Sequence, residues 1–328
     1  MILLIRFAII GTNIISDKFI YAASIYKDVE IYAIYSRTYE RGKYFADKHN
    51  IKNVITDINL LANDNNIDAV YIASPNAIHY EQALIMLSNK KHVLCEKTIT
   101  SNSRELKNII EIANKNKVVI LEAMRSIFDT GFLNIKNNLY KLGKIRNVFF
   151  EYCQYSSRYD NYKKGIIENA FKVELSNGAL MDIGVYCIHT LANLFGMPKE
   201  IKSNSIKLET GVDGAGTIIT KYDDMTAILN YSKITNGFSQ SHIQGENATM
   251  LIPKIAEPYE IKICYRNGEV KTIKREHCEN NMIYEIKEFI NLINNNIYDN
   301  EYIKKSEIVL NIIDEVKKQN NIVFSADK

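Results

Sequence analysis

Short apolar runs rich in β-branched residues alternate with amphipathic stretches of helical length along the first third of the chain. The pattern predicts strands over Ile5–Ile10, Glu30–Tyr35, Ala69–Ala73, His92–Cys95 and Val118–Glu122. It predicts the intervening helices over Ser16–Ile25, Tyr39–His49, Ile78–Asn89 and Ser103–Asn114. Strands and helices that alternate in this way build βαβ units, so we expect a parallel sheet.

The pattern changes after Ala123. Helices are predicted over Phe132–Leu142, Met282–Ile293 and Ile303–Gln319, the last two packing against one of the sheets. The β-rich stretches between them are Val148–Tyr155, Glu200–Leu208, Gly216–Lys221, Met225–Tyr231, Phe238–Gln244, Thr249–Ile252 and Tyr259–Tyr265. A chain of 328 residues exceeds the usual size of a single core. We expect an α/β fold with a parallel-sheet domain over residues 1–123. An α/β domain with a large open, mostly antiparallel sheet follows over residues 124–328.

Composition indicates a globular protein with a small-molecule ligand. Hydrophobic residues make up 46% of the chain, and the net charge of +3 is spread over 41 basic and 38 acidic residues. The sequence has no stripe of basic residues, so we expect neither nucleic acid nor a membrane as a partner. The apolar run Met1–Ile10 is interrupted by Arg6, is too short to cross a bilayer, and is interpreted as the first strand. The five cysteines lack metal-ligand spacing, so we expect reduced thiols, no metal site and a cytoplasmic location.

A candidate phosphate loop follows the first strand. The segment Gly11-Thr12-Asn13-Ile14-Ile15-Ser16 lies where backbone N–H groups and a helix dipole receive a pyrophosphate. It keeps the first glycine of the GxGxxG fingerprint, while Asn13 and Ser16 replace the others. Asn tolerates a left-handed backbone and Ser is small enough for close helix packing. The alternative is an ordinary turn glycine at Gly11, and the strand pattern favours a Rossmann-type nucleotide domain.

The second predicted strand ends in Ser36-Arg37, where NAD-specific folds place an acidic residue on the ribose. A hydroxyl followed by a guanidinium suits a 2′-phosphate, because Arg donates to phosphate in a planar fork. We therefore predict NADP as the cofactor, with NAD possible, since the neighbours Arg41 and Lys43 tune the preference. The alternative is a solvated arginine at the start of a loop.

Five segments together carry a family resemblance. They are Val70–His79 (VYIASPNAIH), Cys95–Thr98 (CEKT), Glu122–Met124 (EAM), Tyr155–Asp160 (YSSRYD) and Gly178–Tyr186 (GALMDIGVY). In this order they resemble the Gfo/Idh/MocA oxidoreductase family. The resemblance implies a Rossmann domain, a second domain with an open sheet, and homodimers or homotetramers. It also implies reversible hydride transfer between NAD(P) and a carbinol of a sugar, cyclitol or diol.

The resemblance implies the site residues as well. Lys97 is the catalytic lysine, and Tyr186 stands where inositol dehydrogenases carry a His. Tyrosine at this position resembles the dimeric dihydrodiol dehydrogenases and glucose–fructose oxidoreductase. The cofactor side comprises Ser74, Asn76, His79, Glu96 and Lys97, in addition to the phosphate loop. The substrate pocket comprises Tyr155, Arg158, Tyr159 and Asn169.

Oxidation of a carbinol needs a base for the hydroxyl proton, and reduction needs the corresponding acid. A tyrosine hydroxyl titrates near pH ~10 in water, and a nearby lysine charge lowers that value. A Lys97–Tyr186 pair is therefore a coherent proton-transfer device, and Lys97 also stabilises a developing alkoxide. Asp182 lies one helical turn before Tyr186 and could hold Lys97 or a substrate hydroxyl. His189 is a second candidate acid.

Each of these residues also has an ordinary structural interpretation. A lysine is usually a solvated charge, a tyrosine is usually packing, and His79 alone would cap its helix. Thr98 departs from the family, which has proline after the lysine. A cis bond before a non-proline residue costs roughly 2.5–4 kcal/mol, so a trans Lys97–Thr98 peptide is predicted. Two other functions remain open: an NAD-dependent glycosidase of the same fold, and a non-catalytic NADP-binding sensor.

Overall fold

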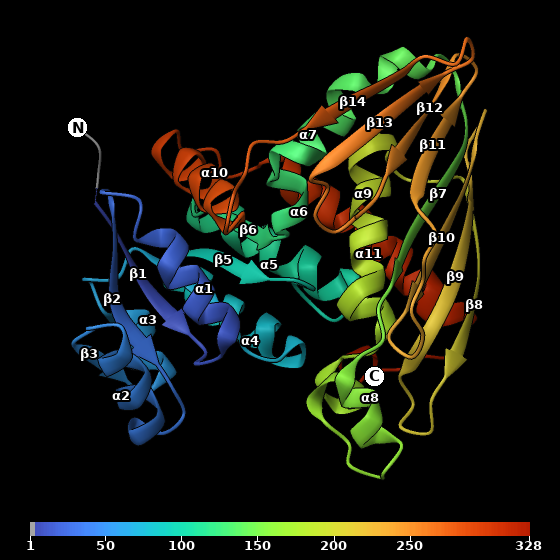
Figure 1. Ribbon diagram of the computed structural model, residues 1–328. Helices are drawn as coiled ribbons and strands as arrows, with labels where there is room; N and C mark the ends of the chain where they lie inside the picture. Colours follow the sequence, from blue (N-terminus) through green and yellow to red (C-terminus); the bar gives the residue numbers. More distant parts are fainter. Residues whose placement is uncertain (1–3) are drawn as a thin grey trace. The chain divides into compact units, whose positions relative to one another are not determined.

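A six-stranded parallel sheet forms the centre of the first of two units (Figure 1). The computed structural model describes residues 4–328, so Met1–Leu3 of the predicted first strand lie outside the described residues. The first unit comprises residues 4–125 and 280–306. Its strands are β1 (Ile5–Ile10), β2 (Val29–Tyr35), β3 (Asn53–Ile55), β4 (Ala69–Ile72), β5 (His92–Glu96) and β6 (Ile120–Ala123).

The strand order is β3-β2-β1-β4-β5-β6, the order of dinucleotide-binding sheets. The direction of strand addition reverses between β1 and β4, and sheets of this order bind their ligands at the carboxyl ends of such a strand pair. The helices of this unit are α1 (Ile14–Ala23), α2 (Tyr39–Lys48), α3 (Ile58–Asn63), α4 (His79–Ser88), α5 (Ser103–Asn116) and α10 (Met282–Asn294), with the 3₁₀ turn η1 (Asn76–Ile78).

Helix α10 comes from the far end of the sequence and packs in this unit beside α1. The Tyr26 hydroxyl donates to the carbonyl oxygen of Ile283 at 2.5 Å, and Asn280 Nδ2 donates to that of Lys18 at 2.8 Å. Phe289 of α10 lies 5.8 Å, centroid to centroid, from the ring of Phe7 on β1. Helix α10 thereby packs in the first unit against residues 257 to 282 positions away in sequence.

The second unit comprises residues 126–279 and 307–328 and is built on an eight-stranded sheet. Its order is β14-β13-β12-β11-β7-β10-β9-β8, antiparallel except for the β7–β10 pair. The strands are β7 (Ile145–Cys153), β8 (Glu200–Lys207), β9 (Asp213–Lys221), β10 (Thr226–Ser232), β11 (Ser241–Gly245), β12 (Ala248–Ile252), β13 (Glu260–Tyr265) and β14 (Val270–Lys274).

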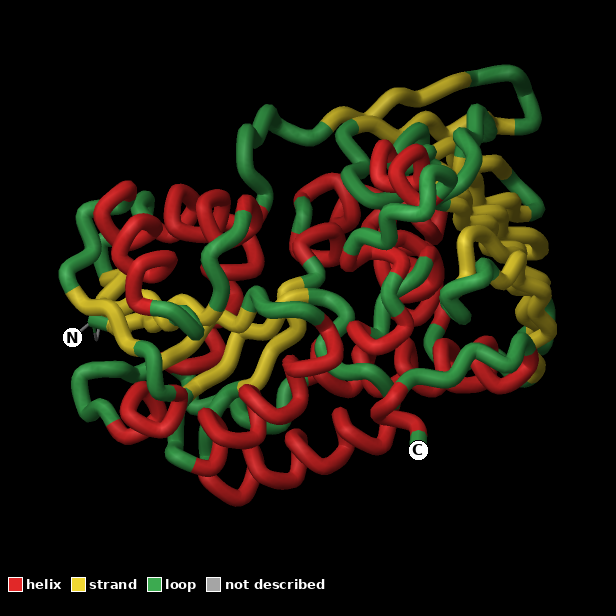
Figure 2. The backbone as a smooth tube through the Cα atoms, turned by 90° about the horizontal axis from the view of Figure 1, so that it is seen from below, coloured by secondary structure: helices red, strands yellow, loops and turns green. Residues whose placement is uncertain are grey.

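Helices of the second unit lie on one side of its sheet, which Figure 2 shows as a yellow layer. They are α7 (Thr130–Asn138), α8 (Ser157–Tyr162) and α9 (Val185–Phe195), with the short turns η2 (Leu139–Leu142), η3 (Asn169–Phe171), η4 (Val173–Leu175), the π-helical η5 (Leu180–Gly184) and η6 (Ser325–Asp327). Two helices contain a boundary between the units: α6 (Arg125–Phe128) and α11 (Glu301–Gln319). Burial alternates along the strands, since Ile218 is fully buried while Ile219 is 46% exposed.

The predicted fold class is confirmed: a parallel sheet is followed by a large, mostly antiparallel one. The predicted strands and helices all correspond to elements of the structure, within a few residues at their ends. The sequence analysis missed the short helices α3, α6 and α8 and the strands β3 and β14. Strand β3 has only three residues, and β14 (VKTIK) is largely exposed and carries two lysines, so neither shows a clear apolar period.

Candidate active site

Gly11 directly follows β1, at the point where the chain turns toward α1. Its φ is +120°, and a Cβ atom there would lie 2.6 Å from the carbonyl oxygen of Ala73. Only glycine fits this backbone conformation and this close approach. The turn therefore brings the end of β1 directly against the segment that follows β4, as a phosphate loop of a Rossmann sheet requires.

Asn13 caps α1 rather than adopting the left-handed conformation that the sequence analysis considered. Its φ is −125° and its ψ 179°, which is extended backbone. The side-chain oxygen accepts hydrogen bonds from the backbone N–H groups of Ile15 at 3.0 Å and Ser16 at 3.1 Å. The side-chain nitrogen donates to the carbonyl oxygen of Ala73 at 2.7 Å. Asn13 thus replaces a glycine by a helix cap that also ties the loop to β4.

The end of β2 carries Ser36, which is buried, and Arg37, which is exposed. Arg41 of α2 points back to the loop, because its Nε donates to the Thr12 hydroxyl at 2.7 Å. Gly42 allows α2 to lie close to this strand end, since a Cβ atom there would lie 3.1 Å from the Cβ of Ser36. The sequence analysis noted Arg41 only as a neighbour, and the structure places its guanidinium on the phosphate loop.

His79 is fully buried at the start of α4, and both ring nitrogens face backbone carbonyl oxygens. Nε2 lies 2.8 Å from the oxygen of Ser74 and Nδ1 lies 3.0 Å from that of Thr98. Burial lowers the pKa of His79, and the two carbonyl contacts oppose this shift. Ser74 also donates from its hydroxyl to Gln82 at 2.7 Å, and Asn76 opens η1. His79 thus links the turn after β4 to the segment that carries Lys97.

Glu96 and Lys97 stand at the carboxyl end of β5. The Tyr71 hydroxyl donates to Glu96 Oε1 at 2.6 Å, and the Lys97 backbone N–H donates to Glu96 Oε2 at 3.3 Å. Burial raises the pKa of Glu96, against the effect of the Tyr71 hydrogen bond. The ring of Tyr71 stacks on Phe19 at 3.8 Å between centroids. The carboxylate before the lysine is therefore fixed from β4.

The Lys97–Thr98 peptide is cis, so the prediction of a trans bond is wrong. That prediction rested on the local preference of a non-proline peptide. Tertiary contacts fix the backbone on the far side of this peptide. The Thr98 carbonyl faces His79, and the Ile99 N–H donates to Glu122 Oε1 at 3.1 Å.

In the second unit, Asp213 holds the start of the helical segment that bears the other predicted catalytic residues. Its Oδ2 accepts from the Leu180 N–H at 2.8 Å. Gly178 makes room for this carboxylate: its φ is +133°, and a Cβ atom there would lie 2.3 Å from Asp213 Oδ1. Burial raises the pKa of Asp213 to about 7, although backbone hydrogen bonds favour the ionised form.

Asp182 lies in η5 and Tyr186 in the first turn of α9. The Tyr186 ring is mostly buried and meets the Tyr152 ring edge-on, with centroids 5.5 Å apart. His189 is fully buried one turn later. Asp182 forms an ion pair with Lys233, a residue that the sequence analysis missed. No motif or periodicity around Lys233 indicates a functional role, because its partner lies 51 positions away.

The four predicted substrate residues lie between β7 and η5. Tyr155 donates its hydroxyl to Asp160 at 2.7 Å, and its ring meets that of Tyr159 edge-on at 5.8 Å. Arg158 is exposed on α8, and Asn169 opens η3. The segment therefore presents hydroxyl, guanidinium and amide groups from one unit.

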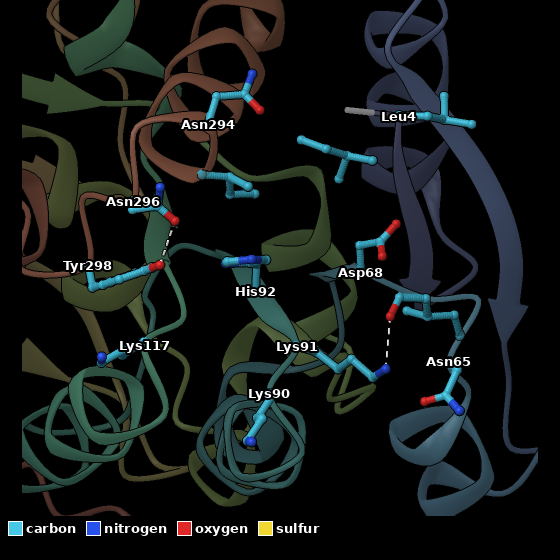
Figure 3. Close-up of a pocket in the computed structure, with 13 residues that line it drawn as sticks. Leu4, Asn65, Asp68, Lys90, Lys91, His92, Lys117, Asn294, Asn296 and Tyr298 are labelled. Atoms are coloured by element: carbon cyan, nitrogen blue, oxygen red, sulfur yellow. Dashed lines mark hydrogen bonds between the residues drawn. The ribbon is translucent and has the colours of Figure 1, made fainter. Parts of the chain in front are cut away.

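A cavity of about 660 Å³ lies elsewhere in the first unit, at the amino ends of the parallel strands (Figure 3). His92 starts β5 there, and its Nδ1 accepts from the Val119 N–H at 2.9 Å. Lys91 donates to the carbonyl oxygens of Asp64 and Ile67 at 2.7 and 2.8 Å. Parallel sheets bind their ligands at the opposite edge, and within residues 4–328 no predicted site residue lines this cavity.

Residues 4–328 lack a cluster of metal ligands and contain one long apolar helical stretch. No group of three His, Cys, Asp or Glu residues there could hold a metal ion. One helical stretch in this range, Val173–Phe195, is long and apolar enough to cross a membrane, but 78% of its apolar window is buried within the protein. This stretch comprises η4, η5 and α9 of the second unit and carries Asp182 and Tyr186.

Comparison with known families matches both units. Residues 5–124 match the family model described as an oxidoreductase family with an NAD-binding Rossmann fold. Residues 140–251 match the GFO/IDH/MocA C-terminal domain. The chain belongs to the GFO/IDH/MocA oxidoreductase family. The resemblance inferred from the sequence is thereby confirmed, and the protein is an NAD(P)-dependent oxidoreductase.

Two relatives within the GFO/IDH/MocA family align with nearly the whole chain. The scyllo-inositol 2-dehydrogenase (NADP(+)) IolU of Bacillus subtilis is 45% identical over 99% of this chain and 100% of its own. The trans-1,2-dihydrobenzene-1,2-diol dehydrogenase of Xenopus laevis is 27% identical over 97% and 99%. Among solved structures, the 3-ketoreductase KijD10 of Actinomadura kijaniata, in complex with NADP and TDP-benzene, superposes with a TM-score of 0.86. It is 19% identical and covers 96% of this chain and 98% of its own, and at that identity the likeness shows the fold alone.

Proposed function

We propose that the protein catalyses reversible, NADP-dependent hydride transfer at a carbinol of a cyclitol, sugar or related diol. The observation that supports this most is the end-to-end similarity, at 45% identity, to a scyllo-inositol 2-dehydrogenase that uses NADP. Tyr186 alone favours the diol dehydrogenases, whereas this relative moves the expected substrate toward cyclitols. Both are small polyols with neighbouring hydroxyl groups.

The residues of the first unit fit a dinucleotide phosphate. Gly11 lets the turn after β1 lie close to the Ala73 carbonyl, and the loop lies at the amino end of α1, where the helix dipole favours a pyrophosphate. Ser36 and Arg37 stand at the end of β2, where the 2′-phosphate of NADP is recognised. Arg41 adds a second guanidinium, which is 2.7 Å from the Thr12 hydroxyl. Two guanidinium groups and a hydroxyl favour NADP over NAD.

In the proposed reaction, Lys97 and Tyr186 handle the proton. The hydride is exchanged with the nicotinamide when the cofactor is bound. In the oxidation direction, the substrate hydroxyl proton passes to the Tyr186 oxygen, and in reduction the same oxygen returns it. The Lys97 ammonium stabilises negative charge on the substrate oxygen and on Tyr186. Asp182 accepts a hydrogen bond from a neighbouring substrate hydroxyl.

Three further expectations belong to this proposal. The partner is a small-molecule substrate, contacted by Tyr155, Arg158, Tyr159 and Asn169. Ser74, Asn76, His79 and Glu96 shape the nicotinamide side of the site. The resemblance to the family also implies a homodimer or homotetramer, and the scattered cysteines favour a cytoplasmic location.

The test is a substrate screen with the full-length protein. Scyllo-inositol, other cyclitols, aldoses and vicinal diols are each offered with NADP and with NAD, and the absorbance of the reduced cofactor is followed. We expect turnover of at least one cyclitol, with kcat/KM at least tenfold higher for NADP. A tenfold preference for NAD would overturn the cofactor assignment.

The same screen separates the alternatives. Cofactor binding without turnover of any polyol favours a non-catalytic sensor. Glycoside cleavage with retained cofactor and no net reduction favours the glycosidase. A native mass measurement on the same preparation tests the oligomeric state.

A further inference from the structure

We propose that Lys233 is a positioning residue of the active site, which orients the carboxylate of Asp182 toward the substrate. Lys233 directly follows β10, on a different strand segment from every residue of the sequence motifs. The inference rests on the proposed function, because it assigns a role in the same reaction. It adds a residue that none of the motifs contains.

The contact itself is between a buried cation and a more open anion. Nζ of Lys233 is hydrogen-bonded to Oδ2 of Asp182. The lysine side chain is only 4% exposed, whereas that of Asp182 is 36% exposed. A buried lysine is rare unless it is paired, so this ammonium depends on its carboxylate partner. The exposed part of the pair is the carboxylate, which is the group able to reach a ligand.

The position of Lys233 is fixed through its backbone. Its N–H donates to the carbonyl oxygen of Gly214 at 2.9 Å, and its carbonyl oxygen accepts from the N–H of Ser156 at 2.9 Å. Ser156 immediately precedes α8, which bears the predicted substrate residues Arg158 and Tyr159. Lys233 therefore joins β9, the start of α8 and η5 at one point.

The side chain of Lys233 is guided by an aromatic surface. Nζ lies 5.3 Å from the centroid of the Phe171 ring, within the range of a cation–π contact. Phe171 is fully buried in a cluster with Ala170 and Val212. The stem of the lysine cannot move far, because packed groups confine it. The ammonium therefore binds one carboxylate oxygen from a fixed direction and sets the rotation of the Asp182 carboxylate.

A stabilising ion pair without a role in catalysis is the competing explanation. It predicts that loss of Lys233 lowers the melting temperature and leaves the kinetic constants of the folded enzyme unchanged. A positioning role predicts a change in kcat, because the carboxylate points elsewhere when its partner is absent. Displacement of a reacting group by about 1 Å can lower a rate by roughly 100-fold.

The experiment compares Lys233→Met, Lys233→Arg, Asp182→Asn and the Lys233→Met/Asp182→Asn double variant, all as full-length protein. We measure kcat and KM for the polyol found in the screen, NADPH affinity by fluorescence, and melting temperature. Lys233→Met should lower kcat roughly 10- to 100-fold with NADPH affinity unchanged. Lys233→Arg should recover part of the loss, and the double variant should be no slower than Asp182→Asn alone.

Lys221→Met is the matched control, since Lys221 forms an exposed ion pair with Glu200 on the same sheet, and its kcat should stay at the wild-type value. An unchanged kcat in Lys233→Met, or losses that multiply independently in the double variant, would overturn the inference. If Lys233→Met does not fold, Lys233→Arg decides. A kcat lowered severalfold, with NADPH affinity and melting temperature unchanged, supports the inference. A wild-type kcat in Lys233→Arg, or in Asp182→Asn, overturns it. If the wild-type protein turns over none of the polyols, the proposed function is overturned and this inference with it. If the wild-type protein is active and Lys233→Met has the same kcat, only the inference is overturned.

Discussion

Nδ1 of His79 lies 3.0 Å from the carbonyl oxygen of Thr98, the residue that follows Lys97. The other ring nitrogen faces the carbonyl oxygen of Ser74 at 2.8 Å. One buried imidazole therefore connects the ends of two neighbouring parallel strands at the edge where ligands bind.

Replacing this imidazole should affect both stability and turnover. His79→Ala leaves two buried carbonyl oxygens without their ring contact, and we expect a loss of about 1–3 kcal/mol in the free energy of unfolding. We also expect a lower kcat, because the Lys97 segment loses its link to β4. Urea unfolding and steady-state kinetics measure the two effects. His92→Ala is the control, since His92 is bonded to Val119 at the opposite edge. Equal losses of stability with equal kcat in both variants would contradict the prediction.

The charge of Lys97 should matter for the chemical step and little for cofactor binding. Lys97→Met should lower kcat by ~100-fold or more and change NADPH affinity by less than about threefold, because charge on the substrate oxygen develops mainly in the transition state. Stopped-flow absorbance and a fluorescence titration separate the two quantities. Lys90→Met, at the amino-end edge of the same sheet, should behave like wild type. An unchanged kcat would remove Lys97 from the mechanism.

Gly178 should be intolerant of a side chain. Gly178→Ala places a methyl group 2.3 Å from Asp213 Oδ1 on a backbone with φ of +133°. We expect a loss of about 2–3 kcal/mol or more in the free energy of unfolding, from strain and from displacement of the carboxylate that caps η5. Gly165→Ala isolates the conformational part, because φ there is +80° and a Cβ would meet nothing within 4 Å. A loss for Gly178→Ala no larger than for Gly165→Ala, measured by urea unfolding, would show that the close approach is relieved.

Glu285 should make stability depend on pH. It is fully buried on α10, and neither carboxylate oxygen has a hydrogen-bond partner among residues 4–328. Burial raises the pKa of Glu285 well above the ordinary value of 4.5, and the nearby charge of Glu96 adds to this shift. An acid with a raised folded-state pKa contributes stability that is fully present below pH 4.5 and is lost as the pH rises through the folded-state value. Wild type should therefore lose stability toward alkaline pH.

Glu285→Gln cannot ionise, so its free energy of unfolding should fall less than that of wild type between pH 5 and pH 9. Glu81→Gln, at an exposed position of α4, should keep the wild-type slope. Urea unfolding at a series of pH values gives both slopes. Parallel curves for wild type and Glu285→Gln would mean that Glu285 titrates normally in the folded protein.

Much of the fold and part of the site follow from local sequence. Strands β1, β2, β4 and β5 were predicted because their apolar runs are short, β-branched and separated by amphipathic helices. Gly11 was identified because a glycine directly after the first strand of such a sheet commonly begins the phosphate-binding turn. Motifs with fixed spacing indicated Lys97 and Tyr186, each of which lies where its element begins or ends.

What the sequence by itself determined is therefore the set of elements, the fold class, the family and the residues of its motifs, because these depend on periods and spacings within about 15 residues. Only the tertiary structure decided which groups those residues meet. Asn13 caps α1 while bonding Ala73, His79 joins Ser74 to Thr98, and Lys233 pairs with Asp182 across 51 positions. Such pairs depend on how strands align and helices pack, and no local pattern of hydrophobic and polar residues encodes that alignment.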